Sequence, residues 1–509
     1  MENSLAVLLA FLHIAALAFI SKIIFKRHPR RKHPPGPKPW PIIGNFNLIG
    51  SLPHQSLHVL SQKYGDIMLL KFGKFPVVIA SSPNMAKQFL RVHDTNFASR
   101  PALAAGKYTA YNYSDVIFAS YGPHWRQARR IYHLEVFNEK RLKSFEHIRV
   151  EERRIFLSRL CSQSGKPVRL RDHLSRYTLS SISRMAFGNK YFSESNHDKA
   201  IVSMDELQEM LDEWFLLNAA LNIGDWIPWL SFLDLQGYVK KMKSLHRKFD
   251  RFNDYVIDDH QATRAAEDDF FPKDVVDMLL LQAEDPNLEV ELTRDCIKGL
   301  LLDVLVAGTD TSATAVEWAV HEILKHPRVT EKAKEELDRV IGRNRWAEEN
   351  DFSQLPYIDA IIMESLRLHP PGTLLVPHYA TDDCKVAGYD ISKGTIVSIN
   401  AWSIGRDPNS WEAPESFLPE RFMGKETDML GSNYALLPFG SGRRRCPGYS
   451  LGLKVVRSTL ANLLHGFNLK LVEGVKPEDI SMEEMYGLTI RPKEPLSIIM
   501  EPTLPDYLY

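Results

Sequence analysis

Cys446 lies in a glycine-rich segment whose residue types suit the binding of iron through sulfur. The segment, Pro438 to Gly452, reads PFGSGRRRCPGYSLG. An iron-bound thiolate needs a pocket that excludes water yet supplies backbone N–H donors, and Gly440, Gly442 and Gly448 permit the turns and close approach that this requires. A helix that begins after Cys446 would add its positive end and lower the pKa of the thiol. The pattern predicts a thiolate-ligand loop.

The other three cysteines are expected to be ordinary structural residues. Cys161, Cys296 and Cys384 stand singly, and the chain has no Cys-x-x-Cys pair. This spacing argues against a disulfide scaffold and against a structural zinc site, and it indicates a reducing compartment for the main domain. We expect these three residues to be small buried hydrophobic side chains.

A second group of chemically capable residues interrupts an apolar helical pattern. Residues 307–312 read Ala-Gly-Thr-Asp-Thr-Ser, and the pattern around them runs from Thr293, a suitable N-cap, to His326. A glycine in mid-helix costs about 1 kcal/mol relative to alanine, and Thr and Asp side chains compete for backbone groups. We therefore expect the helix to loosen here and form a groove for a small ligand. Without the surrounding motif, we would interpret Asp310 as a solvated helix residue.

Both segments resemble motifs of the cytochrome P-450 family. Phe439-x-x-Gly442-x-Arg444-x-Cys446-x-Gly448 is similar to the family's cysteine signature at every defined position, and residues 307–312 resemble its oxygen-binding motif. The resemblance covers nearly the whole chain. It implies a haem b cofactor with Cys446 as the axial iron ligand, Phe439 on the thiolate side of the haem and Arg444 paired with a propionate. An axial thiolate favours O–O cleavage.

The same resemblance implies roles for other polar residues. Asp310 and Thr311 would be catalytic, relaying protons to iron-bound dioxygen in an otherwise dry pocket. Trp125 and Arg129, one helical turn apart, would address the haem propionates. His378 stands where many relatives carry arginine, so it is a further candidate for a propionate contact.

An acid and a base three residues apart, Glu364 and Arg367, are an ordinary surface pair by spacing alone, worth about 0.2–0.5 kcal/mol. Their match to the family's Glu-x-x-Arg motif, followed by Pro-Glu-Arg-Phe with Arg421, implies instead a buried network. We interpret Glu364, Arg367 and Arg421 as structural residues.

The family layout also implies a substrate pocket from residues 102–118, 301–307, 373–376 and 486–489. These segments are mostly apolar, which favours a terpenoid or phenolic substrate, although each side chain could equally fill the core. The candidate pocket residues are Leu302, Leu305, Val306, Ala307, Leu374, Leu375, Val376 and Leu488.

The elements that must position these residues are mainly helical. Periodicity predicts helices over most of residues 84–342, for example 138–160 and 203–217, while residues 66–82 read as a hairpin with a Gly-Lys turn. Short strand-like runs follow residue 377 and recur at 496–500. We expect one mainly α domain with small β-sheets (α+β), of the cytochrome P-450 fold, over residues 45–509.

The first residues predict a membrane anchor. An apolar run over residues 4–25 approaches the roughly 20 residues that span a bilayer, and the basic run KRHPRRKH follows it. We interpret residues 1–25 as a single-pass anchor in the endoplasmic reticulum membrane, with the domain on the cytosolic side, in preference to a cleaved signal. Residues 26–44 form a basic, proline-rich hinge in which no helix can continue. The sequon at Asn112 would then face the cytosol and stay unmodified.

Composition limits the partners. The chain has 63 basic and 63 acidic residues and 44% hydrophobic content, which favours a globular core and gives no sign of a nucleic-acid partner. The motifs imply an O₂-dependent monooxygenase that acts on a small apolar plant metabolite. Its NADPH-derived electrons would come from a separate membrane-bound NADPH–cytochrome P-450 reductase, docked near Arg443 to Arg445.

Two rival functions remain open on the sequence. A haem-thiolate isomerase or lyase acting on hydroperoxides would need neither reductase nor proton relay, so the Asp310-Thr311 pair disfavours it. A haem sensor would need no apolar pocket combined with an oxygen-binding motif. Relatives named by the resemblance include flavonoid hydroxylases and terpenoid oxidases, among them homoterpene-forming enzymes, and these do not fix one substrate.

Overall fold

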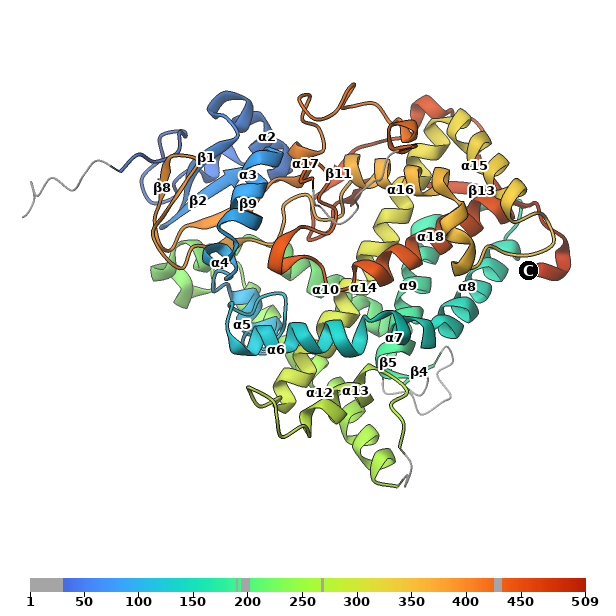
Figure 1. The fold of residues 1–509 in the computed structure, drawn as a ribbon, viewed down its shortest axis with the longest axis horizontal. Helices are drawn as coiled ribbons and strands as arrows, with labels where there is room; N and C mark the ends of the chain where they lie inside the picture. Colours follow the sequence, from blue (N-terminus) through green and yellow to red (C-terminus); the bar gives the residue numbers. More distant parts are fainter. Residues whose placement is uncertain (1–30, 189–190, 194–201, 267–269, 425–432) are drawn as a thin grey trace, which may run out of the picture.

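The computed structural model describes residues 31–188, 191–193, 202–266, 270–424 and 433–509. The predicted anchor at residues 1–25 and the start of the predicted hinge lie outside these ranges. Within them the chain is mainly helical with small sheets, as predicted (Figure 1). The α-helices are α2 (Pro53–Tyr64), α3 (Pro83–Lys87), α4 (Asp94–Phe97), α5 (Ala104–Thr109), α6 (Pro123–Ile131), α7 (Glu139–Ser144), α8 (Glu146–Cys161), α9 (Leu170–Phe187), α10 (Met204–Ala219), α11 (Ile223–Trp226), α12 (Tyr238–Ala265), α13 (Val275–Ala283), α14 (Arg294–Lys325), α15 (Pro327–Val340), α16 (Pro356–Leu368), α17 (Ala401–Ile404) and α18 (Tyr449–Gly466).

The strands form several small sheets. They are β1 (Ile67–Phe72), β2 (Phe75–Ala80), β3 (Pro167–Arg169), β4 (Phe192–Ser193), β5 (Val202–Ser203), β6 (His378–Tyr379), β7 (Cys384–Val386), β8 (Tyr389–Ile391), β9 (Ile396–Ile399), β10 (Phe467–Leu471), β11 (Glu484–Met485), β12 (Arg491–Pro492) and β13 (Ser497–Pro502). The largest described sheet has the order β1-β2-β9-β6, with β1 and β2 antiparallel and β2 and β9 parallel. It lies at one end of the molecule, while α8 and α15 lie at the other and α14 runs through the middle (Figure 1).

Several predicted elements are confirmed, with shifts at their boundaries. The hairpin predicted at residues 66–82 is the β1–β2 pair, and the helix predicted at 203–217 is α10. The single helix predicted at 138–160 is two helices, α7 and α8, because the chain turns at Phe145 between them. The run predicted at 496–500 is β13, which pairs with both β10 and β3.

The proline-rich segment before α2 is extended, and it is held against the domain. The Leu69 backbone N–H donates to the Pro35 carbonyl at 2.8 Å, and the Asn45 N–H donates to the Lys71 carbonyl at 2.7 Å. Both contacts lie along β1, the edge strand of its sheet. Arg31 adds an ion pair to Asp383 at 2.7 Å between nitrogen and oxygen. The segment therefore covers the sheet edge.

Helix α14 forms the centre of the core. The Thr293 side chain caps it by accepting a hydrogen bond from the Cys296 N–H, as predicted. The predicted loosening at residues 307–312 is wrong, because the α-helix is unbroken from Arg294 to Lys325. Gly308 has a packing reason instead: a Cβ there would lie 2.8 Å from the Ile182 side chain of α9. A glycine at this position lets the two helices approach closely.

Among the described residues, α14 is also the one helix with the length and apolar composition to cross a bilayer. Its most apolar window is 78% buried inside the domain. Burial of this extent is typical of a core helix in a globular domain.

Candidate active site

The loop before α18 holds Cys446 in a strained turn that only glycine permits. Gly442 has φ +69°, and a Cβ there would lie 2.1 Å from the Leu90 carbonyl oxygen, so any side chain would displace the backbone. The Cys446 N–H donates to the Phe439 carbonyl at 2.9 Å, which closes the turn. Helix α18 begins at Tyr449, shortly after the cysteine, as predicted.

The Cys446 thiol is subject to two opposing effects. Burial raises the pKa of this thiol, while the Gly448 N–H and the Arg129 and Arg445 guanidinium groups lower it. The expected lowering from the start of the helix is therefore present at Gly448, but desolvation of the anion has the larger effect. A metal ion bound to the sulfur would supply the remaining positive charge.

Arg444 is a partly buried cation whose hydrogen bonds all go to uncharged groups. Its guanidinium donates to the carbonyls of Ala98, Val116 and Ala119 at 2.6, 3.0 and 2.6 Å. The same group lies 4.4 Å from the centre of the Trp125 indole ring. Burial and, after it, the positive charge of Arg100 lower the pKa of Arg444 to about 8.

Two more guanidinium groups share this environment. Arg100 donates to the carbonyls of Ile117, Val376 and Pro377, and burial lowers its pKa to about 10. Arg129 has its pKa lowered mainly by burial, and its charge acts on Cys446. Within the described part of the chain, none of these three arginines forms an ion pair with a carboxylate. Unpaired buried charges are expensive, so the arrangement favours an anion from outside the chain.

Asp115 is the acid that compensates these arginines in part. It accepts hydrogen bonds from the Phe118 and Ala119 N–H groups, and burial raises its pKa to about 6. The Asp303 carboxyl of α14 accepts from the Val116 N–H at 2.7 Å, and burial raises its pKa well above the usual value. These two carboxyls contribute less than two negative charges near neutral pH. The positive excess fits the carboxylates of a haem's propionate groups.

His378 and Trp125 lie beside the arginines, with their donors already engaged. The His378 Nδ1 lies 2.8 Å from the Phe97 carbonyl, and burial together with Arg100 lowers the pKa of the ring to about 3. A neutral ring that donates from Nδ1 has only a lone pair on Nε2, so it can donate to a propionate only when protonated. The Trp125 indole N–H donates to the Val116 carbonyl at 3.1 Å. The propionate contacts of both residues remain predictions.

Asp310 is held by residues that the sequence analysis did not identify. Arg171 of α9 forms an ion pair with one of its oxygens, and the Thr489 hydroxyl donates to the other. Arg171 also donates to Glu317 at 3.2 Å and to Thr314 at 2.9 Å. Burial raises the pKa of Glu317 to about 7. The cluster therefore contains two acids for one guanidinium.

Thr311 directs its hydroxyl back to the helix. Its Oγ1 donates to the Ala307 carbonyl at 2.7 Å, and Ala307 itself is exposed despite its place in a core helix. A hydroxyl that bonds to the carbonyl four residues earlier keeps a lone pair free to accept.

Glu364, Arg367 and Arg421 lie together as a buried cluster. Arg367 donates to both oxygens of Glu364 at 2.7 and 2.8 Å, and Arg421 donates to one of them at 3.0 Å. The Glu364 and Arg367 side chains are fully buried. The remaining Arg367 donors reach the carbonyls of Gly405, Pro414 and Ser416. The cluster thereby joins α16 to the segment that precedes the Cys446 loop.

The predicted pocket residues separate into two groups by exposure. Leu302, Leu305 and Val306 are almost fully buried in the main core, whereas Leu374, Leu375, Val376 and Leu488 are partly exposed and Ala307 is exposed. Leu375 lies 3.7 Å from the position of a Cβ on Gly440, which brings it next to the Cys446 loop. The partly exposed group is therefore the better candidate for substrate contact.

Sequence reasoning missed Arg100, Asp115 and Arg171 as site residues. Asp115 ends a Tyr-Asn-Tyr-Ser-Asp segment, residues 111–115, whose three left-handed residues, Tyr111, Asn112 and Tyr113, form the turn before it. Arg171 is 139 positions from Asp310, and nothing local marks it as a partner. Long-range pairing of this kind leaves no spacing signal.

Comparison with known proteins gives a consistent picture. The family model described as Cytochrome P450 matches residues 34–499. The chain is 42% identical to dimethylnonatriene synthase from Zea mays, over 99% of this chain and 97% of that protein. It is 41% identical to flavonoid 3'-monooxygenase from Petunia hybrida, over 97% of this chain and 96% of that protein. A zebra fish cytochrome P450 structure with progesterone superposes with a TM-score of 0.75 and 25% identity, covering 88% of this chain and 99% of that one.

Proposed function

The chain belongs to the cytochrome P450 family of haem-thiolate monooxygenases, and we propose that it oxidises a small apolar plant specialised metabolite with O₂ and NADPH-derived electrons. The observation that carries the proposal is the pairing of the Cys446 loop with one buried and two partly buried arginines that have no carboxylate partner among the described residues. A sulfur ligand and a cationic cluster together match the two ends of a haem.

A bound haem supplies the oxygen-activating iron chemistry, which an axial thiolate promotes. In our proposal Cys446 is the iron ligand, Phe439 lies on the thiolate side, and Arg129, Arg444, Trp125 and His378 hold the propionates. Gly442 keeps the loop close enough to the Leu90 backbone for this geometry. The cost of ionising the buried Cys446 thiol would be offset by the metal rather than by the protein dipoles.

Asp310 and Thr311 of α14 are the proposed proton relay. Thr311 can accept a proton on a free lone pair while its hydroxyl donates to Ala307, and it passes a proton on when that bond to Ala307 breaks. Arg171 contacts one oxygen of Asp310, so we propose that Asp310 takes part in the relay when this pair rearranges, with Glu317, whose pKa is about 7, as a nearby proton source. The relay therefore depends on Arg171.

The substrate class that we propose follows from the relatives and from the pocket walls. The relatives named above act in dimethylnonatriene formation and flavonoid oxidation. The partly exposed pocket residues are apolar, which suits a terpenoid, including oxidative cleavage to a homoterpene, or a flavonoid or phenolic ring. Spectral titration with an acyclic terpenoid alcohol and with a flavanone separates these classes, because a bound substrate displaces water near the iron and shifts the Soret band.

The proposed electron donor is NADPH–cytochrome P450 reductase in the endoplasmic reticulum membrane. Arg443 and Arg445 lie on the outer side of the Cys446 loop, although Arg443 already pairs with Asp94 at 2.8 Å. Arginine clusters of this kind attract acidic partners. The predicted anchor would place both proteins on the same cytosolic membrane face.

A second candidate function is a reductase-independent isomerase or lyase that acts on hydroperoxides. The observation in its favour is that Arg171 and Thr489 occupy both oxygens of Asp310. Such an enzyme needs no delivered proton. Turnover of a fatty-acid or terpenoid hydroperoxide without NADPH, with no turnover of the parent compound when NADPH and reductase are present, would select this function.

The carbon monoxide difference spectrum of the reduced protein is the decisive experiment. We expect a strongly red-shifted Soret band in the wild type and its loss in Cys446→Ser, with Cys384→Ser as the control for a cysteine outside the loop. Absence of the band from haem-loaded wild type would overturn the ligand assignment.

For the relay, Thr311→Ala should divert NADPH from product to peroxide, while Thr311→Ser should retain coupling.

A further inference from the structure

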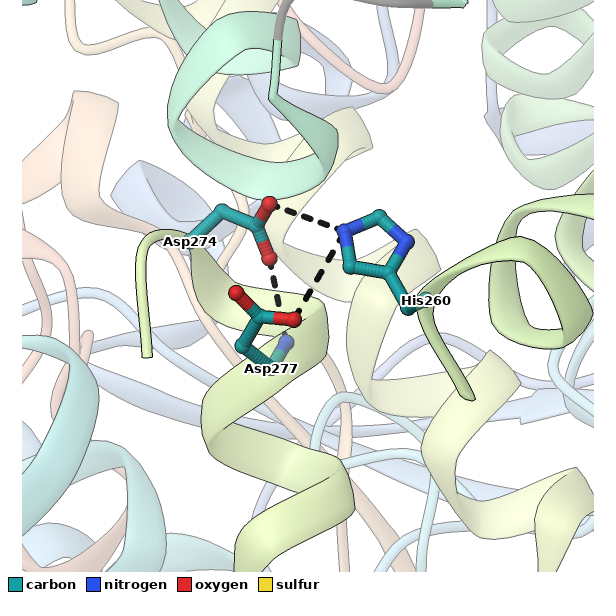
Figure 2. Close-up of side chains that lie close together, drawn as sticks. All are labelled: His260, Asp274 and Asp277. Carbon is teal, nitrogen blue, oxygen red and sulfur yellow. Dashed lines mark hydrogen bonds and ion pairs between the residues drawn. The ribbon is translucent and has the colours of Figure 1, made fainter. Parts of the chain in front are cut away.

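Three buried side chains outside the active site converge on one point between two helices. His260 lies near the end of α12, and Asp274 and Asp277 lie at the start of α13 (Figure 2). Their exposed fractions are 8%, 5% and 4%. One nitrogen or oxygen of each residue lies within 4.8 Å of those of the other two. Nothing in the monooxygenase reaction uses this cluster.

Each of the three residues uses one atom for the backbone and leaves another for the cluster. Asp274 Oδ1 accepts from the Asp277 N–H at 3.0 Å and caps α13, and Asp277 Oδ2 accepts from the Lys273 N–H at 2.9 Å. His260 Nδ1 lies 2.8 Å from the Val256 carbonyl. The ordinary capping role of the acids thus accounts for one oxygen of each carboxylate. Asp274 Oδ2, Asp277 Oδ1 and His260 Nε2 face one another (Figure 2).

The hydrogen bonds outside the cluster show that one ring nitrogen of His260, Nδ1, carries a proton. A carbonyl can only accept, so His260 Nδ1 must carry the proton. The Tyr191 hydroxyl lies 3.0 Å from the same nitrogen but directs its own proton to Asp259 at 2.5 Å. In the neutral ring Nε2 therefore has a lone pair, and this lone pair faces the Asp274 carboxylate at 2.9 Å. The contact is favourable when Nε2 carries a second proton, or when both groups bind one cation.

The charges around the cluster also favour a cation. Two carboxylates are buried here, and Lys273, which lines the same cavity, is a cation that acts on Asp277. Arg184 in the same wall is engaged by Glu151 and Glu152 at 2.7 and 2.6 Å. The positive end of α13 contributes about half a charge. An imidazolium would neutralise one carboxylate, whereas a divalent ion would neutralise both.

The geometry suits a small divalent transition metal. Zinc bonds of about 2.0–2.1 Å in a tetrahedron place ligand atoms about 3.3 Å apart. The Nε2 distances of 2.9 Å to Asp274 and 3.8 Å to Asp277 lie on either side of this value. Metal-bound histidines commonly donate their second N–H to a backbone carbonyl, as His260 does to Val256. A cavity of about 290 Å³, lined by all three residues, has room for a water as fourth ligand.

We propose that His260, Asp274 and Asp277 form a divalent transition-metal site, with zinc as the favoured ion, that pins α12 to α13. The site is separate from the haem and independent of the proposed substrate. Its imidazole–dicarboxylate ligand set selects zinc or a similar ion over magnesium, which prefers all-oxygen coordination.

Zinc binding to the full-length, haem-loaded protein tests the proposal. After treatment with EDTA, equilibrium dialysis against zinc followed by metal analysis should give one more zinc per chain in wild type than in Asp277→Asn. Asn keeps the hydrogen bond to Lys273 and removes the charge. Asp285→Asn, which removes an exposed charge just after α13, should bind like wild type. Loss of one ligand should weaken binding by at least about 10–100-fold, the range seen for outer partners alone.

A second pair of measurements guards against misfolding of one variant. Asp274→Asn retains an N-cap side chain and should lose the same zinc, with the Soret band as a check on folding. X-ray absorption at the zinc edge of wild type should show oxygen and nitrogen ligands including one imidazole. Equal zinc content in wild type and both variants, with a melting temperature insensitive to zinc and EDTA, would overturn the proposal and leave a histidinium ion pair.

Discussion

Two groups of buried and partly buried arginines in this protein differ in how their charges are balanced. Arg367 and Arg421 share Glu364, which supplies both of its oxygens to them. Arg100, Arg129 and Arg444 instead donate to carbonyls or lack a described partner, with Asp115 as the acid nearby. The charges of the first group are balanced within the chain. The charges of the second group are balanced only when anions from outside the chain bind.

The difference shows how the role of a buried charged residue can be inferred from its partners. A cluster that satisfies its own charges holds the fold together, and breaking it leaves an isolated ion. A cluster that is left positively charged stores electrostatic energy that a ligand can release. This contrast separates the arginines that we interpret as structural from those that we propose to bind the cofactor.

Breaking the balanced cluster should have the largest effect. Glu364→Gln leaves two buried guanidinium groups without a carboxylate and should reduce stability by about 3–5 kcal/mol. The measurement is the urea midpoint for loss of the Soret band. The control is Glu415→Gln, which removes a largely exposed partner of Arg406 and should change stability by less than about 1 kcal/mol. Equal effects of the two variants would contradict the distinction.

Removing a charge from the group formed by Arg100, Arg129 and Arg444 should reduce haem retention more than it reduces the stability of the fold. Arg444→Met removes a charge that the chain does not pair, so haem retention should fall by about 2 kcal/mol or more while the haem-free protein keeps its stability. Transfer of haem to excess apomyoglobin measures retention. Arg443→Met, on the exposed side of the loop, is the matched control. Loss of stability without faster haem transfer would place Arg444 with the structural group.

His378 should make the unbalanced region sensitive to acid. Its ring titrates near pH 3 in the folded chain and near 6.5 when unfolded, so the unfolded state binds more protons below pH 6.5 and stability falls as pH decreases. At pH 5 this amounts to about 2 kcal/mol in the haem-free protein. His378→Gln should remove this loss, as seen by melting at pH 5 and pH 7.5. With haem bound the difference should shrink, because propionates favour the imidazolium.

Asp310→Asn should have the smallest effect on stability. Arg171 keeps Glu317 and the Thr314 hydroxyl, so the change should be below about 1.5 kcal/mol, in contrast to Glu364→Gln. Chemical denaturation of the two variants side by side makes this comparison. Asp310→Asn should nevertheless lower product formed per NADPH. A variant that is strongly destabilised yet fully coupled would assign Asp310 to the structural group.

The sequence predicted the elements whose signals are local. The Cys446 loop, the capped start of α14 at Thr293 and the β1–β2 hairpin each depend on residues within a short window. The mainly α fold and the family follow from such windows and are confirmed by the comparisons. The roles of individual site residues remain predictions.

The rest depends on distant contacts and on solvation. Gly308 reads as a helix weakness in sequence, whereas in the fold it accommodates Ile182 of α9. The start of α18 suggests an acidic thiol, whereas burial of Cys446 has the larger effect on its pKa. Neither the approach of a second helix nor the depth of burial can be derived from neighbouring residues.

The segment from Pro35 to Asn45 has a practical bearing on shortened versions of the chain. Its hydrogen bonds occupy groups along β1 that would otherwise face water at the edge of a sheet. Exposed strand edges pair with those of other molecules and cause aggregation. A truncated chain that starts before Pro35 should therefore stay dispersed, whereas one that starts after Asn45 should precipitate even though its haem site is intact.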